Sequence, residues 1–223
     1  VSWKDDGNRM LTGARVSRAG TVMDPGGFTL GGMPQWFADI DFDGTNWLVT
    51  WADLREGGWD IRGIRVGPTG YPLDPASFSI CSATGDQVAP DVAFDGLNYL
   101  VVWQDHRNPA APDIYAGRVS TAGAVLDPDG FIVCDDGGEQ VNPAVAFGNG
   151  NHVVVFGDDR RVNDWDNIYA VRVSPGALVL DTIGYPVDMA EHWQVRPRIE
   201  FGGTGFLVAW EDHRSGLDGD LHR

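Results

Sequence analysis

The sequence lacks three features that would each point to a different kind of protein. Lysine is nearly absent, since Lys4 is the only one, and 32 acidic residues outnumber 16 Lys and Arg residues to give a net charge of −16. Such a surface repels phosphate groups, so we expect neither a nucleic-acid partner nor binding to anionic membranes. No apolar run approaches the roughly 20 residues of a membrane span, so we expect no membrane insertion. Helical periodicity is missing too, which favours an all-β fold.

The motifs that mark common active sites are also absent. The sequence has no Gly-x-Ser-x-Gly nucleophile motif, and its histidines lie outside the Glu-x-x-His and Cys-x-x-Cys patterns of metal sites. His106, His192 and His213 are expected in loops, and His152 replaces a strand aromatic. Spacing alone therefore identifies no catalytic set.

What the sequence does contain is a repeat of about 50 residues. The run at residues 92–105 is echoed at 40–53, 145–158 and 199–212. The repeats share one aromatic anchor, and the set comprises Trp3, Trp51, Trp103, Phe156 and Trp210. Successive anchors lie 48, 52, 53 and 54 residues apart. A period of this length is typical of propellers and other repeat arrays.

One repeat reads as a series of short strands joined by tight turns. The expected strands are residues 89–94, 99–103 and 113–120, followed by an outer edge at 124–127 that is broken before 131–133. Four antiparallel strands per repeat, with neighbouring sheets burying each other's faces, are the design of a propeller blade. A β-sandwich also contains four-stranded meanders, but it does not repeat one anchor about every 50 residues. The sequence therefore predicts an all-β β-propeller of four-stranded antiparallel blades.

The repeat also sets the expected domain organisation. We expect a single propeller domain or propeller fragment over residues 1–223, with blades at 35–86, 87–139 and 140–192 and partial blades at 1–34 and 193–223. A four-bladed ring closed by joining the two ends would place Trp3 and Trp210 at the same site. Five blades, two of them incomplete, or a fragment of a larger ring are the alternatives. We therefore expect the chain to be part of a longer, multidomain protein.

The pattern Asp-x-Arg recurs directly after the anchor strand. Its members are Asp53 and Arg55, Asp105 and Arg107, Asp158 and Arg160, and Asp212 and Arg214. An arginine fork can bind a carboxylate and backbone carbonyls together, so this set can hold each second-to-third-strand loop in shape. A catalytic group is needed once in a ring, whereas this pattern recurs from blade to blade, so we expect a structural motif. The regularly spaced Gln35, Gln87, Gln140 and Gln194 are expected to tie one blade to the next.

Two features that could suggest a disulfide or a metal have simpler explanations. Cys81 and Cys134 occupy the same position in adjacent repeats, where the Cα separation should exceed the roughly 4.4–6.8 Å of a disulfide, so we expect two free, buried thiols. Residues 39–44 read Asp-x-Asp-x-Asp-Gly, the opening of an EF-hand loop, but Thr50 stands where that loop needs an acidic residue. We expect no cofactor and no metal, with calcium as a minor alternative.

Three tryptophans depart from the repeat. Trp59, Trp165 and Trp193 stand where other repeats carry proline, alanine or acidic residues. The second-to-third-strand loop and the loop between blades return to the same face of a blade, so the three rings are expected on one rim. Exposed indoles beside carboxylates and amides suit a sugar, because a ring stacks on the apolar face of a pyranose while polar groups bind its hydroxyls. This rim is the expected ligand site, with packing of each ring over its own loop as the alternative.

Two phrases of the repeat carry a resemblance to known proteins. Residues 94–107 read Phe-Asp-Gly-x-Asn-Tyr-Leu-Val-Val-Trp-x-Asp-x-Arg, and residues 113–120 read Asp-Ile-Tyr-x-x-Arg-Val-Ser. They resemble the repeats of secreted or surface β-propeller proteins of bacteria and archaea, which are distantly similar to TolB-type β-propellers. The resemblance covers essentially the whole chain. It implies an extracellular or cell-surface setting and no shared catalytic residues, and fold alone does not decide the function of a propeller.

Two functions remain open. The favoured one is a noncatalytic extracellular binding or adhesion module with a glycan or protein ligand, because the blades are regular and no acid-base or nucleophile set stands out. The alternative is a glycan-acting enzyme, either a glycoside hydrolase or a lyase, whose carboxylates come from nonrepeated loops such as Asp164, Asp166 and Glu191. Two carboxyl groups about 5–9.5 Å apart across a groove would favour the enzyme.

Overall fold

The fold is an arc of small antiparallel β-sheets. The computed structural model describes residues 10–31, 35–54, 57–160 and 166–213, and these ranges contain sixteen strands and no helix. The strands form three four-stranded sheets and two two-stranded sheets. Within these ranges no helix is long and apolar enough to cross a membrane.

In each four-stranded sheet the strands lie side by side in the order in which they occur in the sequence. The first contains β3 (Gln35–Phe42), β4 (Trp47–Leu54), β5 (Trp59–Val66) and β6 (Phe78–Cys81). The second contains β7 (Gln87–Phe94), β8 (Asn98–Asp105), β9 (Asp113–Ser120) and β10 (Phe131–Cys134). The third contains β11 (Gln140–Gly148), β12 (Asn151–Asp158), β13 (Asn167–Val173) and β14 (Tyr185–Asp188). Before them β1 (Leu11–Gly13) pairs with β2 (Phe28–Gly31), and after them β15 (Gln194–Phe201) pairs with β16 (Phe206–Asp212).

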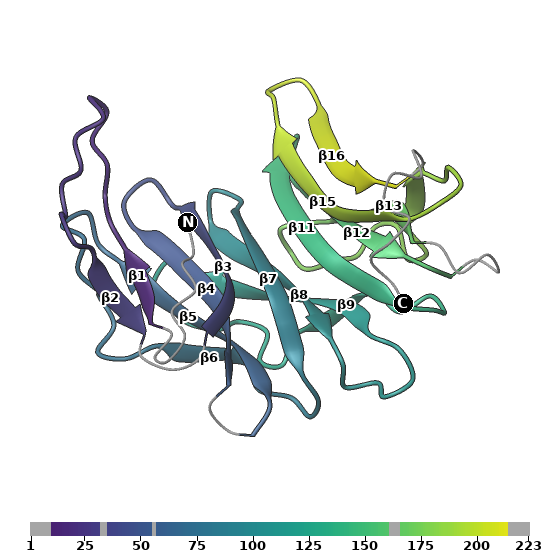
Figure 1. Ribbon diagram of the computed structural model, residues 1–223, viewed down its shortest axis with the longest axis horizontal. Coiled ribbons are helices and arrows are strands. Elements are labelled where there is room, and N and C mark those ends of the chain that lie inside the picture. The colour runs from purple at the N-terminus through teal and green to yellow at the C-terminus, as the bar shows by residue number, and fades with distance from the viewer. Residues whose placement is uncertain (1–9, 32–34, 55–56, 161–165, 214–223) are drawn as a thin grey trace.

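The sheets follow one another from the purple β1–β2 pair to the yellow β15–β16 pair (Figure 1). The first strand of each later sheet packs against the first strand of the next, so that β3, β7, β11 and β15 lie side by side in that order on the inside of the arc. This arrangement is that of propeller blades around an axis. The prediction of an all-β β-propeller of four-stranded antiparallel blades is therefore confirmed, with partial blades at both ends of the described chain.

The hydrophobic core lies between the sheets. The apolar cluster between the second and third complete sheets joins residues such as Leu100 and Ile114 to Phe156 and Val171, all four fully buried. Similar clusters fill the seams between the other neighbouring sheets. Because each cluster joins two adjacent blades, stability comes from nearest-neighbour packing, as in other repeat proteins.

The aromatic anchors lie in these seams as predicted, with one difference. Trp51, Trp103 and Phe156 are all 0% exposed, at equivalent positions of β4, β8 and β12. Trp210 is only half-buried, because β16 pairs with β15 alone and is an edge strand within the described chain. Trp3 lies outside the described residues.

An arginine clasp shapes the outer hairpin of four successive blades within the described residues, and it was not predicted from the sequence. Arg118 in β9 donates to Asp127 through its backbone N (3.0 Å), Nε (2.8 Å) and Nη2 (2.9 Å). The same pair recurs nine residues apart as Arg15 and Asp24, Arg65 and Asp74, and Arg172 and Asp181. This clasp explains why residues 124–127 form only an isolated bridge at Val125 and the fourth strand begins at Phe131.

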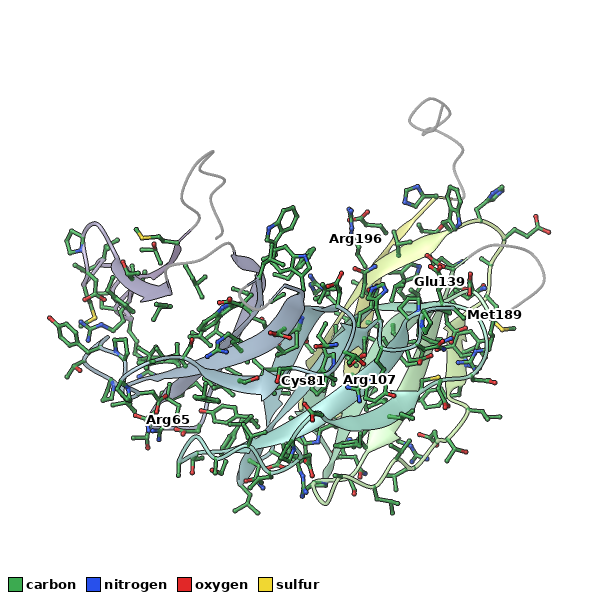
Figure 2. The ribbon with its side chains drawn as sticks, turned by 90° about the horizontal axis from the view of Figure 1, so that it is seen from below. Arg65, Cys81, Arg107, Glu139, Met189 and Arg196 are labelled. Atoms are coloured by element: carbon green, nitrogen blue, oxygen red, sulfur yellow. The ribbon has the colours of Figure 1, made fainter. Side chains whose placement is uncertain are left out.

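The Asp-x-Arg loops make dense local contacts. Asp105 accepts hydrogen bonds from Trp103 Nε1 (2.8 Å), Arg107 N (2.9 Å) and Arg107 Nη2 (2.7 Å). The Arg107 guanidinium lies 3.9 Å from the centroid of the Tyr115 ring and 3.6 Å from Cys81 Sγ, and Figure 2 labels Cys81 and Arg107 next to each other. Burial raises the pKa of the Cys81 thiol to about 12, so it stays protonated at neutral pH.

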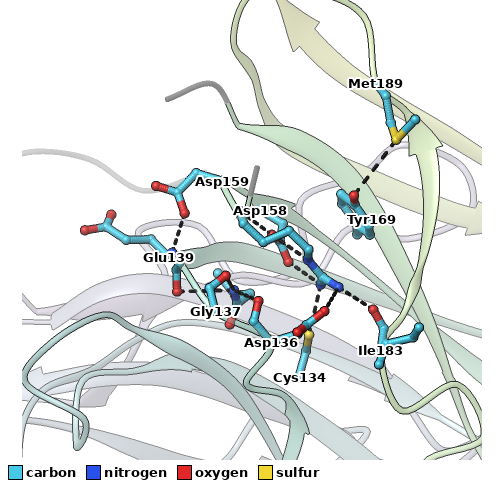
Figure 3. A network of polar contacts seen from close by, with 12 residues as sticks. Cys134, Asp136, Gly137, Glu139, Asp158, Asp159, Tyr169, Ile183 and Met189 are labelled. Atoms are coloured by element: carbon cyan, nitrogen blue, oxygen red, sulfur yellow. Dashed lines mark hydrogen bonds and ion pairs between the residues drawn. The ribbon is translucent and has the colours of Figure 1, made fainter. Parts of the chain in front are cut away.

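The same arrangement recurs one blade later around Arg160. Its guanidinium pairs with Asp158 and Asp136, donates to the Ile183 carbonyl and lies 3.2 Å from Cys134 Sγ (Figure 3). Cys81 and Cys134 are both buried and form no disulfide, as predicted. Asp53 is fully buried and accepts from Trp51 Nε1 at 3.0 Å. Arg55 and Arg214 lie outside the described residues.

Candidate functional site

A bulge at the same point of every inner strand prepares the site. The strand register shifts two or three residues after the glutamine that begins each inner strand. One residue of each bulge adopts a left-handed backbone conformation. These residues are Phe37 (φ 54°), Ala89 (φ 51°), Asn142 (φ 51°) and Arg196 (φ 53°). A β-bulge re-aims the side chains that follow it. In this protein the bulge keeps the scaffold constant while each blade presents a different residue.

The inner strands surround a cavity of about 490 Å³ on the axis. Its lining contains three tiers, each with one residue from β3, β7, β11 and β15. The first tier consists of the bulge residues Phe37, Ala89, Asn142 and Arg196. The second consists of Asp39, Asp91, Ala144 and Arg198, and the third of Asp41, Ala93, Ala146 and Glu200. Figure 2 labels Arg196 on β15, well away from Arg65 on the outer hairpin. The charged residues of the cavity therefore stand at positions where the repeats differ from one another.

Asp39 and Asp91 form the electrostatic centre of the cavity. Asp39 Oδ2 accepts from Val92 N (2.8 Å) and Asp91 Oδ2 accepts from Val145 N (2.7 Å), so each carboxyl group also reaches across to the next inner strand. Burial, followed by the charge of Asp39, raises the pKa of Asp91 to about 7. Burial also raises the pKa of Asp39, while the Arg198 charge acts in the opposite direction on both. The pair thus holds a proton near neutral pH that an isolated aspartate would have lost.

Asp39 and Asp41 belong to the run that resembles the opening of a calcium loop. Both lie on strand β3 and line the axial cavity, whereas Asp43 accepts from Thr45 N and Asn46 N (both 2.7 Å) in the hairpin turn. Among residues 10–31, 35–54, 57–160 and 166–213, no group of three or more His, Cys, Asp or Glu side chains is placed to hold a metal. The Asp-x-Asp-x-Asp-Gly run therefore serves the axis and a turn in this fold.

The structure describes two of the three tryptophans expected on one rim. Trp59 begins β5 and is half-buried, with its backbone N bonded to Asp86 Oδ1 (3.0 Å). Trp193 is 40% exposed in the loop before β15, where its carbonyl accepts from His213 N (3.0 Å). Trp165 lies outside the described residues. Trp59 contacts a ring that the sequence analysis did not single out, Trp36, at a centroid distance of 6.0 Å.

The loop carboxylates proposed for an enzyme do not converge on the axial cavity. Asp166 lies directly before β13, beside Asp159 and Glu139, and burial, followed by these charges, raises its pKa to about 6. Glu191 is exposed in the loop before β15. Asp164 lies outside the described residues. None of the described members of this set lines the cavity, so the axial residues are the stronger catalytic candidates.

Comparison with known proteins gives structural similarity without sequence similarity. No protein-family model matches the chain, and no curated protein matches it. Among solved structures, a thermostable family-43 glycoside hydrolase is similar with a TM-score of 0.57 and 13% identity, over 82% of this chain and 67% of the other. An endo-arabinase from Bacteroides thetaiotaomicron VPI-5482 gives 0.56 and 11% over 82% and 76%. An alpha-L-arabinofuranosidase from Lactobacillus brevis gives 0.54 and 11% over 82% and 70%.

These comparisons correct two expectations. The similar propellers are named as glycoside hydrolases and arabinan-type enzymes, so the TolB-type comparison is not supported, whereas the β-propeller itself is. The expectation of a noncatalytic binding or adhesion module is contradicted by the same matches, which favour the alternative of a glycoside hydrolase. The regular repeat favoured a binding module, but the inner strands also carry carboxyl groups that differ from blade to blade and line the cavity.

Proposed function

We propose that this protein is a glycoside hydrolase whose active site is the axial cavity. The observation that carries the proposal is the Asp39–Asp91 pair, which keeps a proton near neutral pH inside a cavity built from the nonrepeated residues of four blades. Hydrolysis of a glycosidic bond needs a carboxylic acid with a raised pKa to protonate the leaving oxygen. Asp91 is the residue proposed for that role.

The reaction also needs an ionised carboxylate on the other side of the sugar, acting as a base for water or as a nucleophile. Glu200 of β15 and Asp41 of β3 line the same cavity from different blades. Glu200 is exposed to solvent and lines the cavity from the blade farthest along the chain, so it is the proposed partner of Asp91. Arg198 lines the cavity as well, and its charge is positioned to limit the pKa rise of both aspartates.

The substrate proposal follows the names of the similar structures. An endo-arabinase and an alpha-L-arabinofuranosidase share the fold, so α-linked arabinose polymers are the first substrates to test. A strongly acidic protein suits an uncharged polysaccharide of this kind better than an anionic one. We also propose that the protein acts outside the cell, where polymeric glycans are found.

The test is hydrolysis of linear arabinan, arabino-oligosaccharides and 4-nitrophenyl α-L-arabinofuranoside by the 223-residue chain. Release of reducing ends or nitrophenol should fall at least about 100-fold in Asp91→Asn and in Glu200→Gln, the loss typical of a missing acid or base. Asp135→Asn is the matched control, because Asp135 is exposed and does not line the cavity. Full activity in Asp91→Asn would reject the axial site, and no release from any glycoside by the wild type would reject the proposed function.

A further inference from the structure

A cluster of three aromatic rings, one of which lines the axial cavity, lies on the blade formed by β3 to β6. The Trp36 ring centroid lies 5.8 Å from that of Phe37, with the planes at 49°, and 6.0 Å from that of Trp59, with the planes at 75°. We call these three residues the aromatic platform. Phe37 lines the axial cavity, so the platform begins at the proposed active site and leads away from it.

The platform is not explained by packing of the core. Trp36 is 42% exposed and Phe37 is 54% exposed, while Trp59 alone packs against a core cluster. The other inner strands carry small or polar residues at the two positions: Val88 and Ala89, Val141 and Asn142, and Val195 and Arg196. The repeat therefore does not require aromatic rings there.

Phe37 also occupies an unfavourable backbone conformation. Its φ of 54° lies in the left-handed region, which bulky residues rarely adopt. Such strain persists where the surrounding structure imposes it and is concentrated at functional sites. Here the bulge imposes the conformation, and its result is a half-exposed ring that lines the cavity.

Polar groups continue the surface beyond the rings. Trp59 N donates to Asp86 Oδ1 (3.0 Å), and the carbonyl of Asp86 accepts from His106 N (2.8 Å). His106 lies in a groove of about 190 Å³ together with Gln104, Asn108 and Glu139. Gln104 Oε1 in turn accepts from Asn142 N (3.2 Å), and Asn142 lines the axial cavity. The platform and the groove are thus connected to one another and to the cavity.

We infer that the aromatic platform binds several consecutive sugars of an uncharged polysaccharide and feeds the chain into the axial cavity. The inference deepens the proposed function by naming the substrate class: a long neutral glycan rather than a small glycoside. Rings stack on the apolar faces of sugars, and the amide, imidazole and carboxylate groups of the groove bind their hydroxyls. The net charge of −16 and the nearby Asp86 and Glu139 disfavour a polyanionic glycan.

The test measures binding without turnover. Every variant also carries Asp91→Asn, so that the polysaccharide is not hydrolysed during the experiment. Affinity electrophoresis is run in gels that contain linear arabinan, xyloglucan or polygalacturonate. Trp36→Ala and Phe37→Ala should each weaken retention by at least one neutral polysaccharide about tenfold or more, as for truncation of an interface aromatic. Tyr71→Ala is the matched control, since Tyr71 is an aromatic residue, 71% exposed, on the outer hairpin. Near-ultraviolet circular dichroism confirms that every variant is folded.

The outcomes separate this inference from the proposed function. Unchanged retention in both platform variants, no retention by either neutral polysaccharide, or stronger retention by polygalacturonate would overturn the platform. Platform-dependent retention without hydrolysis of any glycan by the wild type would support the platform and reject the hydrolase. If hydrolysis occurs, Trp36→Ala should reduce the rate on linear arabinan about tenfold more than it reduces the rate on 4-nitrophenyl α-L-arabinofuranoside.

Discussion

Replacing Arg107 by alanine removes the guanidinium group that pairs with the fully buried carboxylate of Asp105. Asp105 is 0% exposed, and Arg107 provides it with two guanidinium hydrogen bonds, from Nε (2.9 Å) and Nη2 (2.7 Å). The variant also loses the bond from Nη2 to the Asp129 carbonyl (2.7 Å) and the stack over Tyr115 (3.9 Å). Removing one partner of a buried ion pair costs about 3–5 kcal/mol, because the other charge stays behind uncompensated. The Arg107 side chain is 24% exposed, so water can replace part of the loss, and we expect about 3 kcal/mol.

Thermal unfolding at pH 7 measures this cost. In a chain of this size 1 kcal/mol changes Tm by about 2–4 °C, so Arg107→Ala should lower Tm by about 6–12 °C. The matched control is Arg65→Ala, which breaks the Arg65–Asp74 clasp on the outer hairpin, where the two side chains are 20% and 13% exposed. No fully buried charge remains in the control, so we expect a loss of about 1 kcal/mol.

A double variant tests the physical reason directly. Asp105→Asn combined with Arg107→Ala leaves a neutral amide in place of the buried carboxylate, so it should be more stable than Arg107→Ala alone. The reasoning is refuted if Arg107→Ala lowers Tm no more than Arg65→Ala does, or if the second substitution fails to restore any stability. Loss of hydrolysis or glycan binding at unchanged Tm would show that the Asp-x-Arg motif serves activity or binding and not stability.

Two further predictions concern the axis and the anchor. Because the pKa of Asp91 is about 7 in the folded state against an ordinary 3.8, this group stabilises the fold at low pH and loses that contribution as pH rises from about 4 to 7. The Tm of the wild type should therefore fall relative to that of Asp91→Asn as the pH rises from about 4 to 7. Parallel curves of Tm against pH for the two proteins would contradict the raised pKa of Asp91. Gly130 has a φ of 73°, and a Cβ there would lie 2.4 Å from the Trp103 ring, so Gly130→Ala should cost about 2–4 kcal/mol in urea unfolding. Gly96→Ala, with a φ of 95° but open space around it, should cost only about 1 kcal/mol, and equal losses would show that the ring contact does not matter.

The repeat made the fold predictable because packing constrains every blade in the same way. The anchors at Trp51 and Trp103 fill equivalent seams, so their spacing reports directly on the architecture. The outer edge was less accessible to sequence analysis, since residues 124–127 have strand-like composition, yet the side chain of Asp127 binds Arg118 and takes the edge out of the sheet. The Arg and Asp of each clasp do recur from repeat to repeat, but the alternating pattern of a strand does not show that their side chains pair.

The axial site was missed for a related reason. Asp91, Ala144 and Arg198 occupy one tier of the cavity, but in a repeat alignment their differences read as tolerated variation. Which side chains face the axis depends on the bulge, because a shift of one residue moves side chains to the other face of a strand. The sequence signal that could have found the site is that inner strands of otherwise similar repeats carry unlike charged residues.

The clasp arginines have a mechanical consequence. Arg15 donates to the Pro68 carbonyl (2.7 Å), Arg65 to that of Thr121 (3.1 Å) and Arg118 to that of Pro175 (3.4 Å), so each reaches only the hairpin of the following blade. A pulling force applied to the two ends would therefore open one seam without loosening the next. Each blade of about 50 residues would then extend by roughly 170 Å, at 3.3–3.6 Å per residue. Such a chain would yield in discrete steps under load rather than in a single rupture.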